Sequence, residues 1–132
     1  MLRAKNTMNR TFPRLGHVKF LALDRQWRIS DQAFRHVTNL QSLEMWGCHQ
    51  RRITDEAFRH LSNLTSLDMI WCDQTTITDE PFCHLTNLHS VNVRTCVQTT
   101  ITASSFSASK KTIVAEYGGV QTKNDYRYGP NF

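Results

Sequence analysis

A repeat with a period of 24 residues is the feature that most constrains the fold of this chain. The tripeptide Ile29-Ser30-Asp31 returns as Ile53-Thr54-Asp55, then as Ile77-Thr78-Asp79, and finally as Ile101-Thr102-Ala103. Apolar residues between these tripeptides return in the same phase, and such self-similarity predicts one repeat architecture for most of the chain. Besides the isoleucines, the columns are Phe34, Phe58, Phe82 and Phe106; Val37, Leu61 and Leu85; Leu40, Leu64 and Leu88; Leu43, Leu67 and Val91; Met45, Met69 and Val93; Cys48, Cys72 and Cys96.

Weaker copies of the unit flank these columns. A copy with a shorter connection precedes them and carries Phe12, Leu15, Val18, Leu21 and Leu23. A degraded copy follows, in which Ala115 and Tyr117 stand where Leu67 and Met69 stand, and we expect a weak fifth strand over residues 112–117. The predicted repeat domain therefore spans 12–120 and has about five units, near 12–28, 29–52, 53–76, 77–100 and 101–120.

Each unit combines two hydrophobic periods. From Phe58 to Leu64 the apolar spacing is three, typical of a helix or a 3₁₀ segment, whereas Leu67-Asp68-Met69 alternates as a strand does. Thr54 or Asp55 can cap the helical segment, because either side chain can accept from free N–H groups of the first turn. Such short elements bury their apolar faces only by stacking on neighbouring units, so the pattern predicts a solenoid.

The spacing Leu64-x-x-Leu67-x-Met69-x-x-Cys72 resembles the leucine-rich-repeat strand signature, whose ninth position is Asn or Cys. The Cys followed by Ile-Thr-Asp is similar to the cysteine-containing class of these repeats, best known from F-box substrate receptors of ubiquitin ligases. Tandem Ile-Thr-Asp-x-x-Phe-x-x-Leu units also resemble repeat arrays of large DNA viruses and protists. The match covers residues 12–106 well, but the second Cys of the F-box class is missing and the unit is shorter.

This resemblance implies an α/β fold: a short leucine-rich-repeat solenoid with a parallel sheet on its concave side and short helices on its convex side. Side chains alternate along a strand, so the residues that flank the inward Leu43 and Met45 must point outward. Twelve side chains are thus expected on the concave surface: Phe20, Ala22, Asp24, Ser42, Glu44, Trp46, Ser66, Asp68, Ile70, Ser90, Asn92 and Arg94.

An exposed Trp46 beside Ile70 suggests a binding surface, because exposed apolar patches and Trp or Arg anchors are typical of interfaces. The alternative is that Trp46 folds over the sheet edge and packs on its own neighbours. The candidate partner-binding residues are Glu44, Trp46, Asp68, Ile70, Asn92 and Arg94.

The net charge of +5 is unevenly distributed along the chain. Residues 1–28 and 107–132 are basic, whereas residues 29–106 carry five basic and eight acidic side chains. A nucleic-acid binder should concentrate positive charge on its folded surface, so this distribution argues against nucleic acid as a partner. No apolar run approaches the roughly 18 residues of a membrane span, so we expect no membrane partner.

The two ends of the chain differ from the repeats in composition. The basic leader 1–11 lacks the apolar core of a secretory signal, and we expect both this leader and the tail 121–132 to be disordered. An intracellular, cytoplasmic address is the resulting expectation.

Cysteine and histidine columns raise the question of a metal site. Cys48, Cys72 and Cys96 stand one period apart, without the close Cys or His spacing of a zinc site. We expect these thiols to be buried and to donate to carbonyl groups of neighbouring loops, with Cys83 outside as an unpaired thiol. The column of His36, His60 and His84 should stack on the convex side as copied surface residues. No metal and no cofactor is predicted.

No catalytic motif is present: the chain lacks a phosphate-binding loop, a Gly-x-Ser-x-Gly elbow and a His-Glu-x-x-His pair. The neighbouring carboxylates Glu44 and Asp68 lie on an exposed sheet without a predicted pocket. We therefore expect a non-catalytic module that recognises a protein partner through the concave face. The alternatives are the substrate-recognition part of a ubiquitin-ligase receptor and a truncated repeat product without a binding role. The sequence specifies neither the partner nor the oligomeric state.

Overall fold

The computed structural model describes residues 2–4, 14–24, 29–49, 51–94, 96, 100–102 and 112–114. Within them, six strands form one parallel sheet whose spatial order equals the chain order. The strands are β1 (Leu2–Ala4), β2 (Phe20–Asp24), β3 (Ser42–Trp46), β4 (Ser66–Asp68), β5 (Ser90–Asn92) and β6 (Thr112–Val114).

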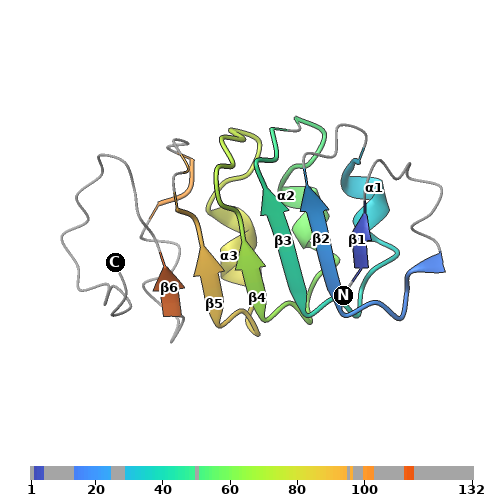
Figure 1. Ribbon diagram of the computed structural model, residues 1–132. Helices are drawn as coiled ribbons and strands as arrows, with labels where there is room; N and C mark the ends of the chain where they lie inside the picture. Colours follow the sequence, from blue (N-terminus) through green and yellow to red (C-terminus); the bar gives the residue numbers. More distant parts are fainter. Residues whose placement is uncertain are drawn as a thin grey trace.

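Short helices connect the central strands: α1 (Asp31–Phe34), α2 (Asp55–Phe58) and α3 (Glu80–His84). Figure 1 shows all of these helices behind the sheet, on one of its two faces. We call this the helical face, and the opposite side of the sheet the open face. The predicted α/β solenoid with a parallel sheet and short helices is confirmed.

Each helix is only about one turn long, so its stability must come from packing and capping rather than propensity. Thr54 is the N-cap of α2, and its hydroxyl oxygen accepts from the Glu56 N–H at 3.2 Å. Thr78 makes the same contact with the Glu80 N–H. Pro81 follows in the first turn of α3, where its missing N–H removes no helical hydrogen bond.

The core lies between the sheet and the helices and is formed by the predicted columns. Every described member of these columns is at most 4% exposed, which confirms their inward assignment. Phe58 and Phe82, which belong to successive units, have ring centroids 6.5 Å apart. Phe106 lies outside the described residues.

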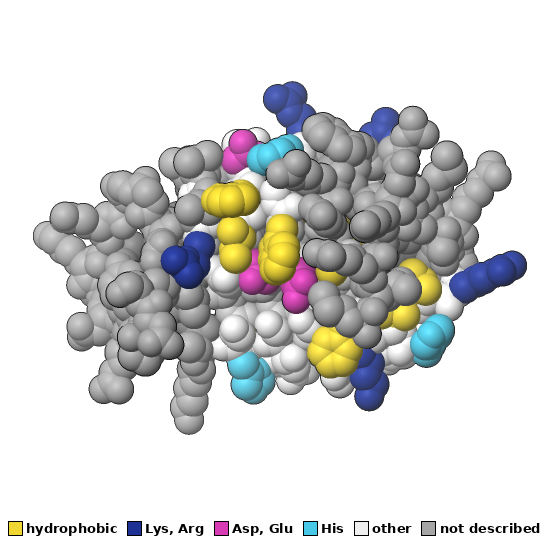
Figure 2. All heavy atoms as spheres, in the orientation of Figure 1, with side chains coloured by type: hydrophobic (Ala, Val, Ile, Leu, Met, Phe, Trp, Pro, Cys, Tyr) yellow, Lys and Arg dark blue, Asp and Glu magenta, His cyan; other side chains and the backbone are white. Residues whose placement is uncertain are grey.

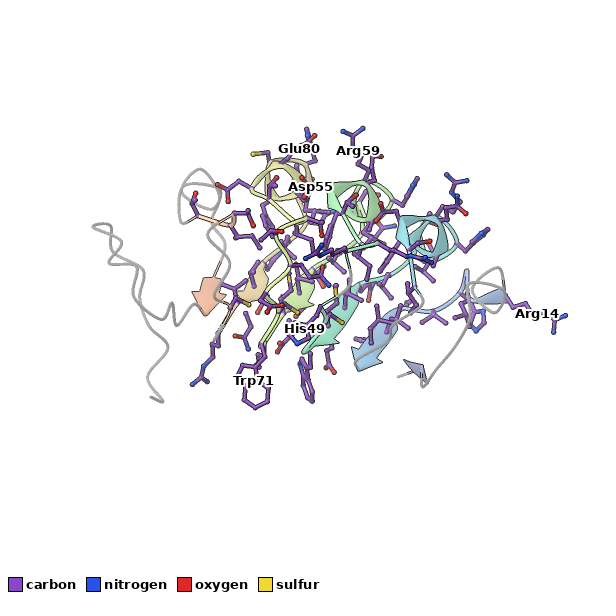
Figure 3. All side chains as sticks on the ribbon, turned by 90° about the horizontal axis from the view of Figure 1, so that it is seen from above. Arg14, His49, Asp55, Arg59, Trp71 and Glu80 are labelled. Atoms are coloured by element: carbon purple, nitrogen blue, oxygen red, sulfur yellow. The ribbon has the colours of Figure 1, made fainter. Side chains whose placement is uncertain are left out.

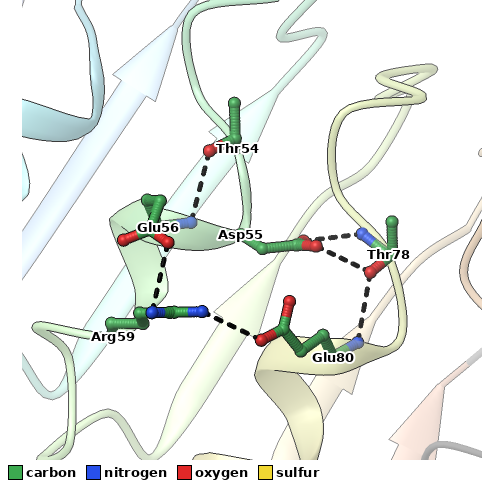
Figure 4. Close-up of polar contacts among 6 residues, drawn as sticks. All are labelled: Thr54, Asp55, Glu56, Arg59, Thr78 and Glu80. Atoms are coloured by element: carbon green, nitrogen blue, oxygen red, sulfur yellow. Dashed lines mark hydrogen bonds and ion pairs between the residues drawn. The ribbon is translucent and has the colours of Figure 1, made fainter.

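The aspartate of each Ile-Thr-Asp tripeptide binds the next unit instead of capping its own helix. Asp55 Oδ1 accepts from the Thr78 N–H at 2.8 Å, and Asp55 Oδ2 accepts from the Thr78 hydroxyl at 2.7 Å (Figure 4). Asp31 makes the same pair of contacts with Thr54, and Asp79 with Thr102. Ala103 lacks a carboxylate, so this ladder cannot continue from the fourth tripeptide.

Two further kinds of polar contact lie on the outside of the solenoid, and the first of them repeats from unit to unit. Asn63 donates from its amide nitrogen to the Thr38 carbonyl at 3.0 Å, and Asn39 and Asn87 occupy equivalent positions. On the helical face, the Arg59 guanidinium pairs with Glu56 at 3.2 Å and with Glu80 of the next unit at 3.1 Å (Figure 4). The asparagine contacts and the Arg59–Glu80 pair therefore join successive units at their surface.

Both ends of the sheet differ from the sequence-based expectation. Leu2–Ala4 were predicted to belong to a disordered leader, but they form β1 and pair in parallel with Leu21–Leu23. The unpaired N–H and C=O groups of β2 offer an edge on which a short segment can pair without any repeat pattern of its own. The rest of the leader and the tail 121–132 lie outside the described residues.

The last strand is also shifted. Ala115 was expected in the column of Leu67, but the sheet pairs Val91 with Ile113, two residues earlier in the chain. The connection before β6 is therefore shorter than the repeat period implied. Of the predicted strand 112–117, the part 112–114 is a strand and the remainder lies outside the described residues.

Candidate partner-binding face

The open face is built from the outward residues of β2 to β5. In the strand register, Ala22, Glu44, Asp68 and Asn92 are successive Cα partners, and Ser42, Ser66 and Ser90 form a parallel row. Hydrophobic and acidic side chains gather side by side over the middle of this face (Figure 2). The predicted columns therefore do tile one continuous surface.

The predicted site residues all lie on or beside this surface. Trp46 ends β3 and is 41% exposed, whereas the other five predicted residues, Glu44, Asp68, Ile70, Asn92 and Arg94, are half-buried. One expected neighbour differs: Ala22 is buried, with a single methyl group as its side chain and strands β1 and β3 on its two sides. The side chain of Asp24 lies outside the described part of the structure.

Hydrogen bonds fix the turn at the carboxyl end of each central strand. Asp68 Oδ1 accepts from the Ile70 N–H at 3.1 Å, and Asn92 Oδ1 accepts from the Arg94 N–H at 3.2 Å. The Asn92 amide also donates to Asp68 Oδ2 at 3.1 Å, which links the two turns. The Asp68 carboxylate is therefore held in place by neutral donors.

The residue that the sequence analysis missed is Trp71. It is 59% exposed and has a left-handed backbone conformation, with φ of 58°. Gly47, one repeat earlier, has nearly the same φ of 60°. A positive φ is common for glycine but is an outlier for a bulky side chain. The 24-residue period places Trp71 at the position of Gly47, and this match could have indicated a glycine-type backbone conformation at Trp71.

Backbone contacts bring the two tryptophan-bearing turns together. The Gly47 N–H donates to the Ile70 carbonyl at 2.9 Å, so the turn that follows Trp46 lies against the turn that carries Ile70 and Trp71. Viewed from above, Trp71 points away from the sheet on the side opposite to Asp55, Arg59 and Glu80 (Figure 3). Trp46, Ile70 and Trp71 thus form an apolar group beside Glu44 and Asp68. We refer to these five residues as the Trp patch.

A second inter-unit contact lies close to these turns. His49 Nδ1 and Asp73 Oδ1 form a half-exposed pair between neighbouring units, and the pair is ionic when His49 is protonated. Both residues follow the strands in the loops that return toward the helical face. This pair ties the loop behind Trp46 to the loop behind Trp71.

The cysteine column forms a ladder of thiol donors, as predicted. Cys48 Sγ donates to the Leu23 carbonyl at 3.6 Å and Cys96 Sγ to the Met69 carbonyl at 2.8 Å, while Cys72 contacts the Met45 carbonyl. The pKa of the Cys72 thiol is raised above its ordinary value, mainly by a hydrogen bond with the neighbouring Cys48 and secondly by burial. Burial raises the pKa of Cys96 to about 11. The thiols of Cys72 and Cys96 therefore remain protonated at neutral pH.

The remaining cysteine and the histidine column lie on the outside. Cys83 is exposed and free, His36 and His84 are exposed, and His60 is half-buried. Among the described residues, no group of three or more His, Cys, Asp or Glu side chains could hold a metal ion. No described helix has the length and apolarity needed to cross a membrane.

Comparison with known families agrees with this architecture. Residues 9–122 match the family described as the BspA type leucine rich repeat region, in six copies. The chain belongs to this family. The BspA-type repeats thus include one copy more than the five units expected, in line with the six strands of the sheet. As a leucine-rich-repeat protein, the chain is a repeat module of the kind used in protein interactions.

A search of curated proteins found no match to this BspA-type chain. Among solved structures, it is similar to a chain in the "Structure of the Toll - Spatzle complex, a molecular hub in Drosophila development and innate immunity", with 16% identity and a TM-score of 0.44. The match covers 67% of the present chain and 15% of that chain.

Proposed function

We propose that this chain is a non-catalytic recognition module that binds a protein partner through the open face of its sheet, with the Trp patch at the centre. The observation that carries this proposal is the conformation of Trp71. A bulky residue at φ of 58° costs of order 1–3 kcal/mol, and its ring is nevertheless mostly exposed. The strained turn thus presents an aromatic side chain to the outside of the protein.

The neighbours of Trp71 support a binding role. Trp46 lies one unit earlier and is also exposed, while Ile70 directly precedes Trp71 in the same turn and is half-buried. Tryptophan is among the residues that most often dominate binding energy at interfaces. A contiguous exposed apolar group on a regular sheet is therefore better explained by a covering partner than by solvent exposure.

The cysteine ladder supports a narrower alternative. Its thiol-to-carbonyl contacts support the resemblance to cysteine-containing repeats, in which case the chain would be the substrate-recognition part of a ubiquitin-ligase receptor. This alternative requires an F-box, which a second protein could supply, and it predicts that ubiquitin-ligase subunits accompany the captured partner. The free thiols also suit a reducing compartment, which supports the proposed intracellular location.

Affinity capture followed by mass spectrometry tests the proposal. The matched baits are the unmodified chain, Trp46→Ala on the open face and His60→Ala on the helical face, each checked for folding by its melting temperature. We expect a protein that the unmodified chain and His60→Ala both capture and that Trp46→Ala loses. Equal capture by all three folded baits would reject the open face. Capture of nothing specific would favour the truncated-product alternative.

A further inference from the structure

The chemistry of the Trp patch identifies the kind of residue that it binds. We propose, as an extension that rests on the function proposed above, that the open face binds a peptide segment carrying an arginine side chain. The guanidinium would lie against the carboxylates of Glu44 and Asp68 and beside the rings of Trp46 and Trp71.

The two carboxylates are placed where they repel each other. Glu44 and Asp68 are Cα partners on adjacent strands, which lie about 4.8 Å apart, and like charges directly opposite each other destabilise a sheet. Both residues are half-buried, so water screens this repulsion only partly. A bound cation would remove that cost.

No described cation neutralises this pair. The ion pairs among the described residues use Glu56, Glu80 and Asp73, and the hydrogen bonds to Asp68 come from the Ile70 N–H and the Asn92 amide, which are neutral. The side chain of Glu44 has no hydrogen bond or ion pair with any residue that the structure describes. Its carboxylate is therefore available to an incoming donor.

The adjacent rings favour arginine over other ligands. Tryptophan is the best aromatic partner for a cation, and the planar guanidinium can stack on a ring while it donates two hydrogen bonds to a carboxylate. Trp46 and Trp71 are exposed at 41% and 59%, so their surfaces are open to a ligand. Glu44 and Asp68 supply oxygen acceptors next to these surfaces.

Partners of other chemistry fit the patch less well. An acidic segment would add a third negative charge beside two existing ones. A purely apolar segment would cover the Trp rings but would also desolvate both carboxylates without giving them a donor, which is costly. A segment with an arginine can stack on the Trp rings and also donate hydrogen bonds to the carboxylates.

A selection from random dodecapeptides displayed on phage tests this inference directly. The immobilised target is the full chain, and peptides that also bind a Trp46→Ala/Trp71→Gly variant are discarded. We expect the remaining, Trp-dependent peptides to be enriched in arginine. Replacing that arginine by the neutral isostere citrulline in a synthetic copy should weaken binding about tenfold or more, the loss expected for a charge-assisted contact.

The protein-side variant is Glu44→Gln, which removes one charge, keeps the shape and breaks no described hydrogen bond. It should weaken the arginine peptide about tenfold and leave the citrulline peptide unchanged. Glu56→Gln, on the helical face, is the matched control and should affect neither peptide. Melting temperatures of both variants verify folding.

The outcomes separate this inference from the proposed function. Trp-dependent peptides without arginine enrichment, or equal binding of the arginine and citrulline peptides, would overturn the arginine inference and leave the open face as a binding surface. Selection of no Trp-dependent peptide would contradict both.

Discussion

Trp71 occupies in its repeat the position that Gly47 occupies one repeat earlier, and the two residues share a left-handed backbone, with φ of 58° and 60°. The turn therefore keeps its geometry whichever residue stands there. Glycine adopts this conformation without steric cost, whereas tryptophan does not. The chain thus gives up local stability at the point where it exposes the most accessible large apolar side chain among the residues that the structure describes.

Trp71→Gly should therefore increase stability. The substitution relieves of order 1–3 kcal/mol of backbone strain and costs roughly 0.5–1 kcal/mol through the greater freedom of glycine when unfolded. We expect an unfolding free energy that is unchanged or up to about 2 kcal/mol higher, measured by urea denaturation. Gly47→Ala is the reciprocal control and should lower it. A clear loss of stability in Trp71→Gly would mean that the ring packs on the sheet strongly enough to offset the strain.

The contacts between the aspartate of one unit and the threonine of the next should contribute more to the free energy of unfolding than the surface ion pairs beside them. Asp55→Ala leaves the N–H and the hydroxyl of the half-buried Thr78 without their acceptors, and we expect a loss of about 1–3 kcal/mol. Glu56→Ala removes only an exposed pair with Arg59 and should change stability by less than about 1 kcal/mol. Urea denaturation of both variants gives the comparison. Equal losses would show that the contacts of Asp55 with Thr78 contribute little.

The four cysteines should react as two groups. Cys83 is exposed, while Cys48, Cys72 and Cys96 are buried, and burial raises the pKa of Cys96 to about 11. At pH 8, a thiol-reactive dye should modify Cys83 rapidly and the other three only as the protein unfolds, because the thiolate is the reactive form. Mass spectrometry of the labelled protein over time counts the modified sites. Rapid labelling of Cys72 in the native protein would show that the ladder is open to solvent.

Most of what could be predicted about this structure from the sequence follows from the repeat period. Residues such as Leu43, Leu67 and Val91 recur in phase, and phase alone decides which side chains face the core and which face outward. The open face and its predicted residues follow from the same alternation. Contacts between side chains of different units were harder to predict from the sequence. Thr54 and Asp55 were equal candidates for capping, and only the structure shows that Asp55 contacts Thr78 of the next unit.

Where the repeat pattern weakens, the prediction failed. Leu2 and Ala4 pair with the column residues Leu21 and Leu23, but two apolar positions are too few to mark a repeat, and their pairing with β2 depends on an available sheet edge. The degraded last unit has too few landmarks to fix a register, so Ile113 rather than Ala115 faces Val91. Trp71 was missed because the hydrophobic columns describe the core and not the backbone conformation of turns.

The central claim is that the open face, and not the helical face, binds the partner. Its most direct test is the affinity of the purified captured partner for three versions of the full chain, measured by isothermal titration calorimetry. Trp71→Gly should weaken binding by roughly 1–4 kcal/mol, the range for an anchor residue at an interface, although its fold is as stable as the original or more so. His60→Ala should bind like the unmodified chain. Unchanged affinity for Trp71→Gly together with a loss for His60→Ala would contradict the account.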